Sequence, residues 1–426
     1  MERAGITPEP PVAVGVGLPW DVPCADPVAE LAAARARLGD TFVVDSGDDR
    51  YLFTFSPAGV ASFYALDEAD ASKGVADWRM LRRKVPDELF AGRRTLPHAL
   101  FSGDDVTMYL ANVARALDLA VDELGAVGEA DVFTFTRRLG HRVGLASWGG
   151  PGAAVGERFD EIVACLDVLD GSESFVHPDA MAAVAGSDYA AERAALARAT
   201  ELIGLSVDDH EPRADLFSRI VERWNGEDDG VRHTGIAHDV VLVHIASMSN
   251  LFAAMGWAIV DLVERPRELS LVAAGDAALA ERCALESTRL AQRSIMSRYV
   301  LNEIELDVGD ATLTVSPGAT VATLLPLTNT SAAPGLDGWD PERWHRRRLA
   351  HASMLPAVEL VTAFGHGRHS CPAQSFSLAA MRSALIRLAS GFELEPGWAS
   401  HPVPVPAQIG GVARADRGCA LAYRRR

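Results

Sequence analysis

The segment Val240–Val260 contains no charged residue, and this run most restricts what the chain can fold into. An apolar run of this length raises the question of a membrane-spanning helix. His244, Ser247, Ser249 and Asn250 lie near its middle, where polar side chains facing lipid are costly. We therefore expect a helix that crosses the interior of a large soluble domain.

Length and composition narrow the class of protein. With 426 residues, 48% of them hydrophobic, the chain can bury a large core, and length alone suggests two or three domains. The formal net charge of −18 disfavours a nucleic-acid partner, because the phosphate backbone would repel the protein. Five scattered cysteines without a paired framework indicate a reducing, cytoplasmic setting. Met1–Pro23 has no basic flank and no long apolar helix, so we expect neither a signal peptide nor a membrane anchor.

Local patterns predict two small β-rich parts, near 40–56 and 311–326. Asp40–Phe55 is predicted to form a hairpin because two apolar runs flank the turn-forming segment 45–49. Thr312–Leu325 is predicted to form a second hairpin around Ser316-Pro317-Gly318. Stretches rich in Ala, Leu, Arg and Glu predict a helical core over 100–300 and a further helix over 372–391. The clearest helical stretches are Val106–Leu124, Val155–Asp170 and Tyr189–Ile203.

Cys371 stands in a glycine-bearing loop at the start of an apolar helical pattern. Pro372 suits the first turn of a helix, where a missing N–H costs nothing, and apolar residues then recur at helical spacing until Gly391. At a helix N-terminus, unpaired backbone N–H groups and the positive end of the dipole favour the ionised sulfur. We therefore predict a thiolate that binds a soft metal centre, with haem iron as the leading candidate.

The remaining cysteines have no motif around them, and we expect them to be buried small hydrophobes; they are Cys24, Cys165, Cys283 and Cys419. A zinc site built from His366, His369 and Cys371 is an alternative for the loop. It would need a fourth ligand, and no second Cys/His pair with suitable spacing accompanies these residues.

The spacing Phe364-x-x-Gly367-x-His369-x-Cys371-x-Ala373 resembles the haem-binding loop of the cytochrome P450 superfamily. The resemblance implies that Cys371 is the proximal iron ligand of haem b (iron protoporphyrin IX) and that His369 pairs with a haem propionate. Ala373 departs from the glycine that is usual there. The resemblance covers nearly the whole chain and implies a single domain over 1–426. Its fold would be mainly α with a small β-rich part, with a long central helix over the haem and the cysteine loop beneath it.

Two further motifs resemble those of the same superfamily. Glu286-Ser287-Thr288-Arg289 matches its Glu-x-x-Arg motif, on a helix that we predict from Asp276 to Met296, and Pro341-Glu342-Arg343 matches the segment that supplies a second arginine. Glu286 and Arg289 lie one helical turn apart and can pair, while Arg343 brings another guanidinium to the same carboxylate. This cluster would hold the ligand loop from behind. Arg298 falls where the superfamily has a further propionate-binding arginine.

The predicted central helix departs from the usual superfamily pattern. By the resemblance, Asn250 stands where most members have threonine, and Ser249 where they have an acid. That acid–alcohol pair organises proton delivery to dioxygen, and an amide relays protons less readily. Ala246-Ser247-Met248-Ser249-Asn250 is similar to the prostacyclin synthase and sterol 7α-hydroxylase branch, which includes an isomerase of a bound peroxide as well as hydroxylases. The alternative role for Asn250 is a hydrogen bond to a carbonyl in a kinked turn of the helix.

Three other segments carry predictions. His98, in a stretch that also resembles that branch, could reach a propionate or be an exposed loop histidine. Pro402–Pro406 marks an extended segment, where related enzymes fold a loop into the substrate pocket. Arg346-Arg347-Arg348 could receive an acidic redox partner, or be solvated surface.

Together these features predict a haem-thiolate enzyme of bacterial-type specialised metabolism that acts on a lipophilic small molecule. The leading hypothesis is atypical chemistry, in which the ferric haem splits an O–O or N–O bond of the substrate, with rearrangement or with oxygen- or nitrogen-atom transfer. The first alternative is a conventional monooxygenase fed by ferredoxin and ferredoxin reductase. The second is a haem-binding protein without turnover. Catalytic roles fall to Asn250, Ser249 and Ala246.

Overall fold

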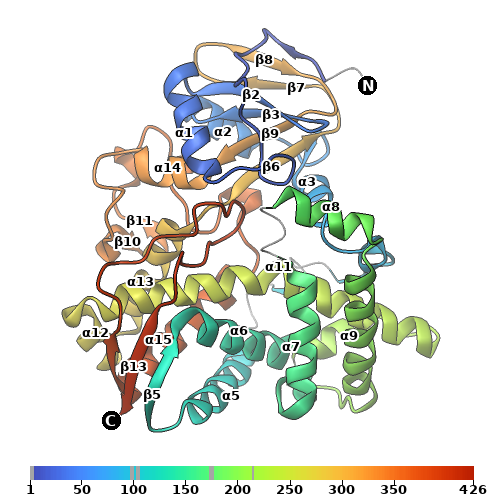
Figure 1. The fold of residues 1–426 in the computed structure, drawn as a ribbon, viewed down its shortest axis with the longest axis vertical. Coiled ribbons are helices and arrows are strands. Elements are labelled where there is room, and N and C mark those ends of the chain that lie inside the picture. Colours follow the sequence, from blue (N-terminus) through green and yellow to red (C-terminus); the bar gives the residue numbers. More distant parts are fainter. Residues whose placement is uncertain (1–3, 96–99, 102–105, 172–176, 214) are drawn as a thin grey trace.

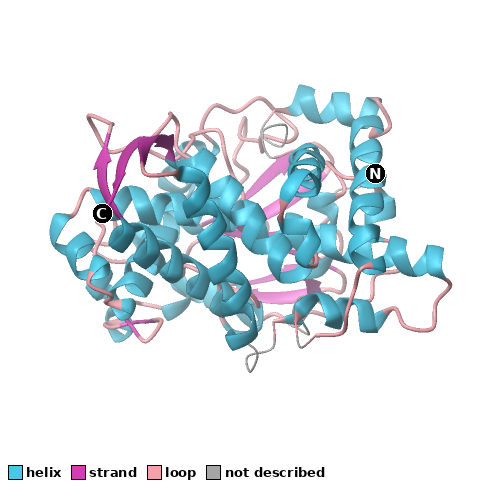
Figure 2. Ribbon diagram, turned by 90° about the horizontal axis from the view of Figure 1, so that it is seen from below, coloured by secondary structure: helices cyan, strands magenta, loops and turns pink. Residues whose placement is uncertain are grey.

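The computed structural model describes residues 4–95, 100–101, 106–171, 177–213 and 215–426, and it is predominantly helical with small β-sheets (Figures 1 and 2). This composition agrees with the mainly α fold that we predicted and is compatible with the cytochrome P450 fold. The helices are α1 (Pro27–Leu38), α2 (Pro57–Ala65), α3 (Lys73–Leu81), α5 (Val106–Leu124), α6 (Val132–Trp148), α7 (Gly156–Asp170), α8 (Pro178–Gly186), α9 (Ala190–Asp208), α10 (Leu216–Arg223), α11 (Asp229–Val263), α12 (Pro266–Ala273), α13 (Ala277–Ala291), α14 (Leu325–Ser331) and α15 (Gln374–Gly391).

In the part of the chain that the structure describes, four small sheets accompany the helices. The largest has the strand order β2-β3-β9-β6-β4, and the others have the orders β1-β8-β7, β12-β13-β5 and β10-β11. The strands are β1 (Ile6–Thr7), β2 (Thr41–Ser46), β3 (Asp49–Thr54), β4 (Ala71–Ser72), β5 (Val127–Asp131), β6 (Ile295–Val300), β7 (Ile304–Asp307), β8 (Thr312–Val315), β9 (Thr320–Leu324), β10 (Trp344–His345), β11 (Arg348–Leu349), β12 (Phe392–Pro396) and β13 (Ala420–Arg425).

The five-stranded sheet has a buried cluster on each face. Val43 and Leu52 belong to one cluster, while Phe42 and Phe53 belong to the other, because successive strand residues point to opposite faces. The largest buried cluster lies among the helices. Figure 1 shows the β-rich part at one end of the molecule and the helical part at the other.

One predicted hairpin is confirmed and the other is wrong. β2 and β3 pair antiparallel from Thr41↔Thr54 to Ser46↔Asp49, as predicted. β8, however, pairs with β1 and β7, whereas β9 pairs with β3 and β6. The turn at 316–319 therefore passes the chain from one sheet to another instead of closing a hairpin.

α11 is the central helix, as predicted from the uncharged run, and it packs against α6, α9, α13 and α15. Among the described residues it is the helix long and apolar enough to cross a membrane, and 78% of its most apolar window is buried inside the protein. Burial within the fold accounts for its hydropathy. Figure 1 shows it crossing the helical part as the yellow-green ribbon.

Two predicted helix boundaries need correction. The helix placed over Asp276–Met296 ends at Ala291, and the chain continues as strand β6 from Ile295. Asp276 does cap this helix, since its side chain accepts a hydrogen bond from Leu279 N–H at 2.9 Å. α15 begins at Gln374, so Pro372 lies in the turn before the helix and not in its first turn.

Candidate functional site

The loop that carries Cys371 is folded tightly against the start of α15. Cys371 N–H donates to the carbonyl of Phe364 at 2.7 Å, which closes the loop. Gly365 has φ +79°, and a Cβ there would lie 2.5 Å from the carbonyl oxygen of His369. Only glycine fits this close approach. The predicted loop residue Gly367 also has positive φ, at +55°.

The surroundings of Cys371 raise the pKa of its thiol, whereas we expected a helix N-terminus to lower it. Burial raises its pKa, and the N–H of Ala373 and the charge of Lys73 only oppose that shift. α15 starts at Gln374, so Cys371 lies three residues before the first residue of the helix. A bound metal ion would lower the pKa of the thiol, since a thiol that coordinates a metal loses its proton. The other four cysteines are buried and unpaired, as predicted.

Glu286, Arg289 and Arg343 meet behind this loop. Both Glu286 and Arg289 are fully buried. Arg289 Nε and Nη2 donate to the two carboxylate oxygens of Glu286 at 2.9 and 2.7 Å, and Arg343 Nε donates at 3.1 Å. Trp344 Nε1, at 2.9 Å, adds a donor that the sequence did not reveal. The predicted contact among the three motif residues is therefore present.

The cluster also reaches the backbone near the loop. Arg289 Nη1 donates to the carbonyls of Asn329 and Leu336 at 2.6 and 2.7 Å. Asn329 in turn exchanges hydrogen bonds with Thr362, whose hydroxyl donates to the carbonyl of Gly365 at 3.1 Å. A continuous chain of hydrogen bonds thus connects Glu286 with the cysteine loop.

Arg298 lies on strand β6 and is fully buried. Its Nη1 donates to the carbonyl of Ala71 at 2.6 Å and lies 3.7 Å from Glu68 Oε2. Its Nε and Nη2 have no partner among the described residues. Two adjacent buried N–H donors match the two oxygens of a carboxylate, so Arg298 fits a haem propionate.

The other predicted cofactor residues are placed as follows. His369 lies in a short 3₁₀ turn, Gly367–His369, with its ring centroid 6.3 Å from that of Tyr64. Phe364 packs against the main helical core, and Ala373 is buried within it. His98 lies outside the described residues.

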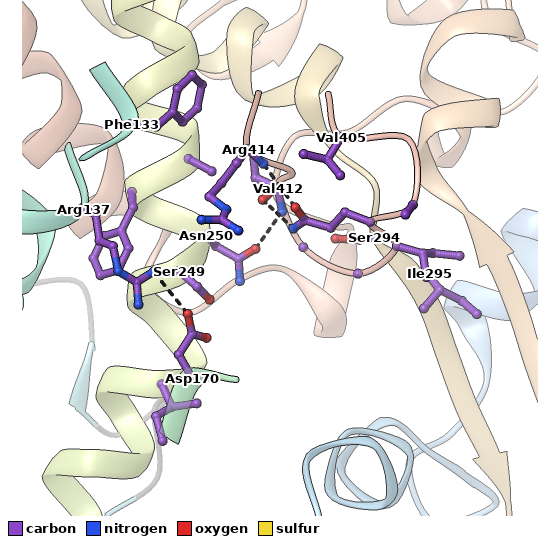
Figure 3. Close-up of a pocket in the computed structure, with 18 of the residues that line it drawn as sticks. Phe133, Arg137, Asp170, Ser249, Asn250, Ser294, Ile295, Val405, Val412 and Arg414 are labelled. Carbon is purple, nitrogen blue, oxygen red and sulfur yellow. Dashed lines mark hydrogen bonds and ion pairs between the residues drawn. The ribbon is translucent and has the colours of Figure 1, made fainter. Parts of the chain in front are cut away.

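A cavity of about 1050 Å³ lies against α11 and contains the three predicted catalytic residues in its lining (Figure 3). Ala246, Ser249 and Asn250 contribute from the helix, 295–297 from strand β6, and 405–418 from the C-terminal segment. We predicted that the segment Pro402–Pro406 enters the pocket, and Val405 is the first residue of this segment that lines the cavity.

The amide oxygen of Asn250 accepts a hydrogen bond from Val412 N–H at 2.9 Å. This contact, drawn as a dashed line in Figure 3, differs from the predicted alternative of a hydrogen bond to a carbonyl in a kinked turn of the helix, because the partner is a backbone N–H of another segment. A Cβ on Gly411 would lie 2.3 Å from Asn250 Oδ1, so a glycine is needed beside the amide. Trp257 Nε1 also donates to the carbonyl of Ala413 at 2.6 Å. α11 and the C-terminal segment are thus joined at two points.

Part of the cavity wall carries paired charges that the sequence did not reveal. Asp170 lies 3.3 Å from Arg137 Nη1 and 3.7 Å from Lys84 Nζ, and all three residues line the cavity. Burial lowers the pKa of Lys84, while Asp170 opposes that shift. Phe133, Phe252, Ile295, Met296, Val405 and Val412 supply the apolar part of the lining. The cavity therefore combines apolar walls with paired charges.

Comparison with known proteins gives partial similarities. No family model matches the chain. The cytochrome P450 monooxygenase sdnQ of Sordaria araneosa is 34% identical over 65 residues, which is 14% of this chain and 12% of that protein. The human 24-hydroxycholesterol 7-alpha-hydroxylase is 26% identical over 151 residues, which is 34% of this chain and 29% of that enzyme. The aligned stretches thus span well under half of either relative. These similarities support the cytochrome P450 superfamily, and with it a haem cofactor and an oxidoreductase.

Proposed function

We propose that this protein is a haem-thiolate enzyme that acts on a lipophilic small molecule with a substrate-borne O–O or N–O bond. We infer a cytoplasmic enzyme of bacterial-type specialised metabolism, in keeping with five cysteines that form no disulfide. The observation that carries the proposal is the cavity over α11, which Asn250 lines. By the resemblance, most superfamily members have at this position the threonine that helps to deliver protons.

The residues that would hold haem b come from the cysteine loop and from strand β6. Cys371 would bind the iron, and His369 and Arg298 would bind propionates. The cluster of Glu286, Arg289 and Arg343 would keep the Cys371 loop in place. Haem iron with a thiolate ligand supplies the electron density that cleaves a bond to oxygen or nitrogen.

Asn250 would orient the reacting group of the substrate. Its amide oxygen is already engaged by Val412 N–H, so the amide nitrogen is the group left to donate to a substrate oxygen. A donor held in one orientation binds an acceptor at less entropic cost than a free side chain would. An amide does not release a proton near neutral pH, so this residue is suited to positioning and not to proton delivery.

A conventional ferredoxin-dependent monooxygenase is the second candidate. Both matched relatives have names that describe hydroxylation or monooxygenation. In that case Ser249 would be the hydroxyl closest in sequence to the usual relay position. Arg346 and Arg348 are exposed and could face an acidic ferredoxin, whereas Arg347 is already paired with Glu281 at 2.8 Å.

Dioxygen consumption separates the two candidates without a known substrate. Purified protein would be supplied with a surrogate ferredoxin, its reductase and NADPH, and compared with Asn250→Thr. Asn250→Ala is the matched control, because it also loses the amide that binds Val412 but adds no hydroxyl. Slow turnover in the wild type and in Asn250→Ala, with a clear rise in Asn250→Thr, would support the proposal. Brisk wild-type turnover that Asn250→Thr does not raise would favour the monooxygenase.

A further inference from the structure

Two buried side chains next to the cysteine loop have donors without an acceptor. Arg298 is 0% exposed and Tyr64 is 8% exposed. Arg298 Nε and Nη2 and the Tyr64 hydroxyl have no hydrogen-bond partner among the described residues. Buried polar groups are normally paired, and leaving them unpaired lowers stability. Three such donors in one region therefore indicate a ligand.

The two side chains come from neighbouring elements and face the same region. Tyr64 lies near the end of α2, and the guanidinium of Arg298 lies 5.5 Å from the ring of the preceding residue, Phe63. Burial and the charge of Glu359 raise the pKa of Tyr64, while the charge of Arg298 opposes that shift, so Tyr64 and Arg298 are close enough to interact. The ring of Tyr64 also lies 5.4 Å from His366, edge to face, and 6.3 Å from His369. Both histidines belong to the loop that carries Cys371.

The donors define the chemistry of the ligand. Nη1 of Arg298 is occupied by the carbonyl of Ala71, and Glu68, whose side chain is half exposed, lies on that side. The remaining guanidinium donors and a phenol hydroxyl together suit an anion with two acceptor oxygens. A carboxylate meets this requirement, and its hydrogen bonds to a guanidinium are strong because both groups are charged.

We propose that Tyr64 acts with Arg298 to bind one propionate of the haem. This inference rests on the proposed function, and it adds a residue that no sequence motif singled out. Tyr64 would be a cofactor-positioning residue, since it touches the propionate and not the reacting atoms.

The test is the rate of haem loss from the holoprotein to an excess of apomyoglobin. Wild type and Tyr64→Phe would each be loaded with haem and, separately, with haem dimethyl ester, which lacks the carboxylates. We expect Tyr64→Phe to lose haem about tenfold faster than wild type, because a hydrogen bond to a charged acceptor is lost. The loss of haem dimethyl ester should change much less.

Tyr51→Phe is the matched control. Tyr51 is likewise a buried tyrosine, but its hydroxyl donates to Asp49 and it packs on the other face of the five-stranded sheet. Its substitution should leave haem loss unchanged.

The melting temperature of the apoprotein gives a second readout, which separates binding of the cofactor from a purely structural role of Tyr64. Because the hydroxyl of Tyr64 is unpaired without the cofactor, removing it should leave the melting temperature of the apoprotein unchanged or raise it. A tyrosine with a purely structural role would lower it.

Equal rates of haem loss from wild type and Tyr64→Phe, or equal acceleration for haem and its dimethyl ester, would overturn the inference while leaving haem binding intact. A carboxylate supplied by a substrate instead of haem would also give unchanged haem loss. Purified wild-type protein that takes up no haem would overturn the proposed function, and the inference with it.

Discussion

Asn250 on α11 and Val412 in the C-terminal segment are separated by 162 residues, yet the backbone N–H of Val412 lies 2.9 Å from the amide oxygen of Asn250. The contact fixes the orientation of the amide at the cavity. It also makes the geometry of the cavity depend on the glycine next to Val412. This dependence gives the first prediction.

Gly411→Ala should lower the free energy of unfolding more than Gly410→Ala does. Both glycines have positive φ, +67° and +99°, so alanine is strained at either position by about 1 kcal/mol. A Cβ at 411 would also lie 2.3 Å from Asn250 Oδ1, whereas a Cβ at 410 would meet nothing within 4 Å. Displacing the Asn250–Val412 hydrogen bond should add about 1 kcal/mol. Urea unfolding measures the difference.

A double-mutant cycle tests the cause. In an Asn250→Ala background, the amide that collides with the new methyl group is absent, so the two glycine substitutions should cost nearly the same. If Gly411→Ala stays markedly worse in that background, the collision with Asn250 is not the reason.

Glu286→Gln should destabilise the protein severely. The carboxylate is fully buried and is shared by Arg289, Arg343 and Trp344. Removing its charge leaves the buried guanidinium of Arg289 uncompensated, which costs about 3–5 kcal/mol. Glu281→Gln is the matched control, because Glu281 also pairs with an arginine, Arg347, but at a partly exposed site worth about 1 kcal/mol or less. Comparable losses in the two variants would contradict this account of the cluster.

Asp261 gives a prediction about pH. Burial raises the pKa of this carboxyl to about 6, opposed by the hydrogen bond from Ser287 and the charges of Arg265 and His401, while Glu264 adds to the rise. In the unfolded chain the pKa of an aspartate is about 4, so the folded state binds the proton more tightly. The stabilising contribution of Asp261 is therefore present at low pH and is lost as pH rises from about 4 to about 6.

Asp261→Asn should remove this loss. The free energy of unfolding of the variant, minus that of the wild type, should increase between about pH 4 and pH 6 and then level off. Urea unfolding at a series of pH values gives the difference directly. A difference that stays flat or falls over this range would show that the pKa of the carboxyl is not raised in the folded protein.

Helical periodicity and local turn chemistry predicted much of this fold. Val106–Leu124 was predicted with the bounds of α5, and the β2–β3 hairpin followed from a short turn between two apolar runs. The hairpin predicted over Thr312–Leu325 failed because alternation identifies a strand but not its partner. The helix that we predicted to run to Met296 ends at Ala291, and strand β6 follows from Ile295. The prediction failed because no glycine or proline lies between the two elements to mark the end of the helix.

In the candidate site, contacts within one local motif could be predicted from the sequence, whereas contacts between distant segments could not. Residues within one motif, such as Glu286 and Arg289, could be paired from their spacing on a helix. The hydrogen bond from Val412 to Asn250, the charged wall at Asp170 and the position of Tyr64 beside the cysteine loop depend on contacts between distant segments. No local pattern in the sequence specifies them.

The central claim is that Cys371 binds haem iron as a thiolate, and the ferrous–CO absorption spectrum tests it most directly. Wild type and Cys24→Ser, a control at a buried cysteine outside the loop, should both show the long-wavelength Soret band of thiolate-ligated haem. Cys371→Ser should lose that band. Survival of the band in Cys371→Ser, or its absence from haem-loaded wild type, would contradict the account.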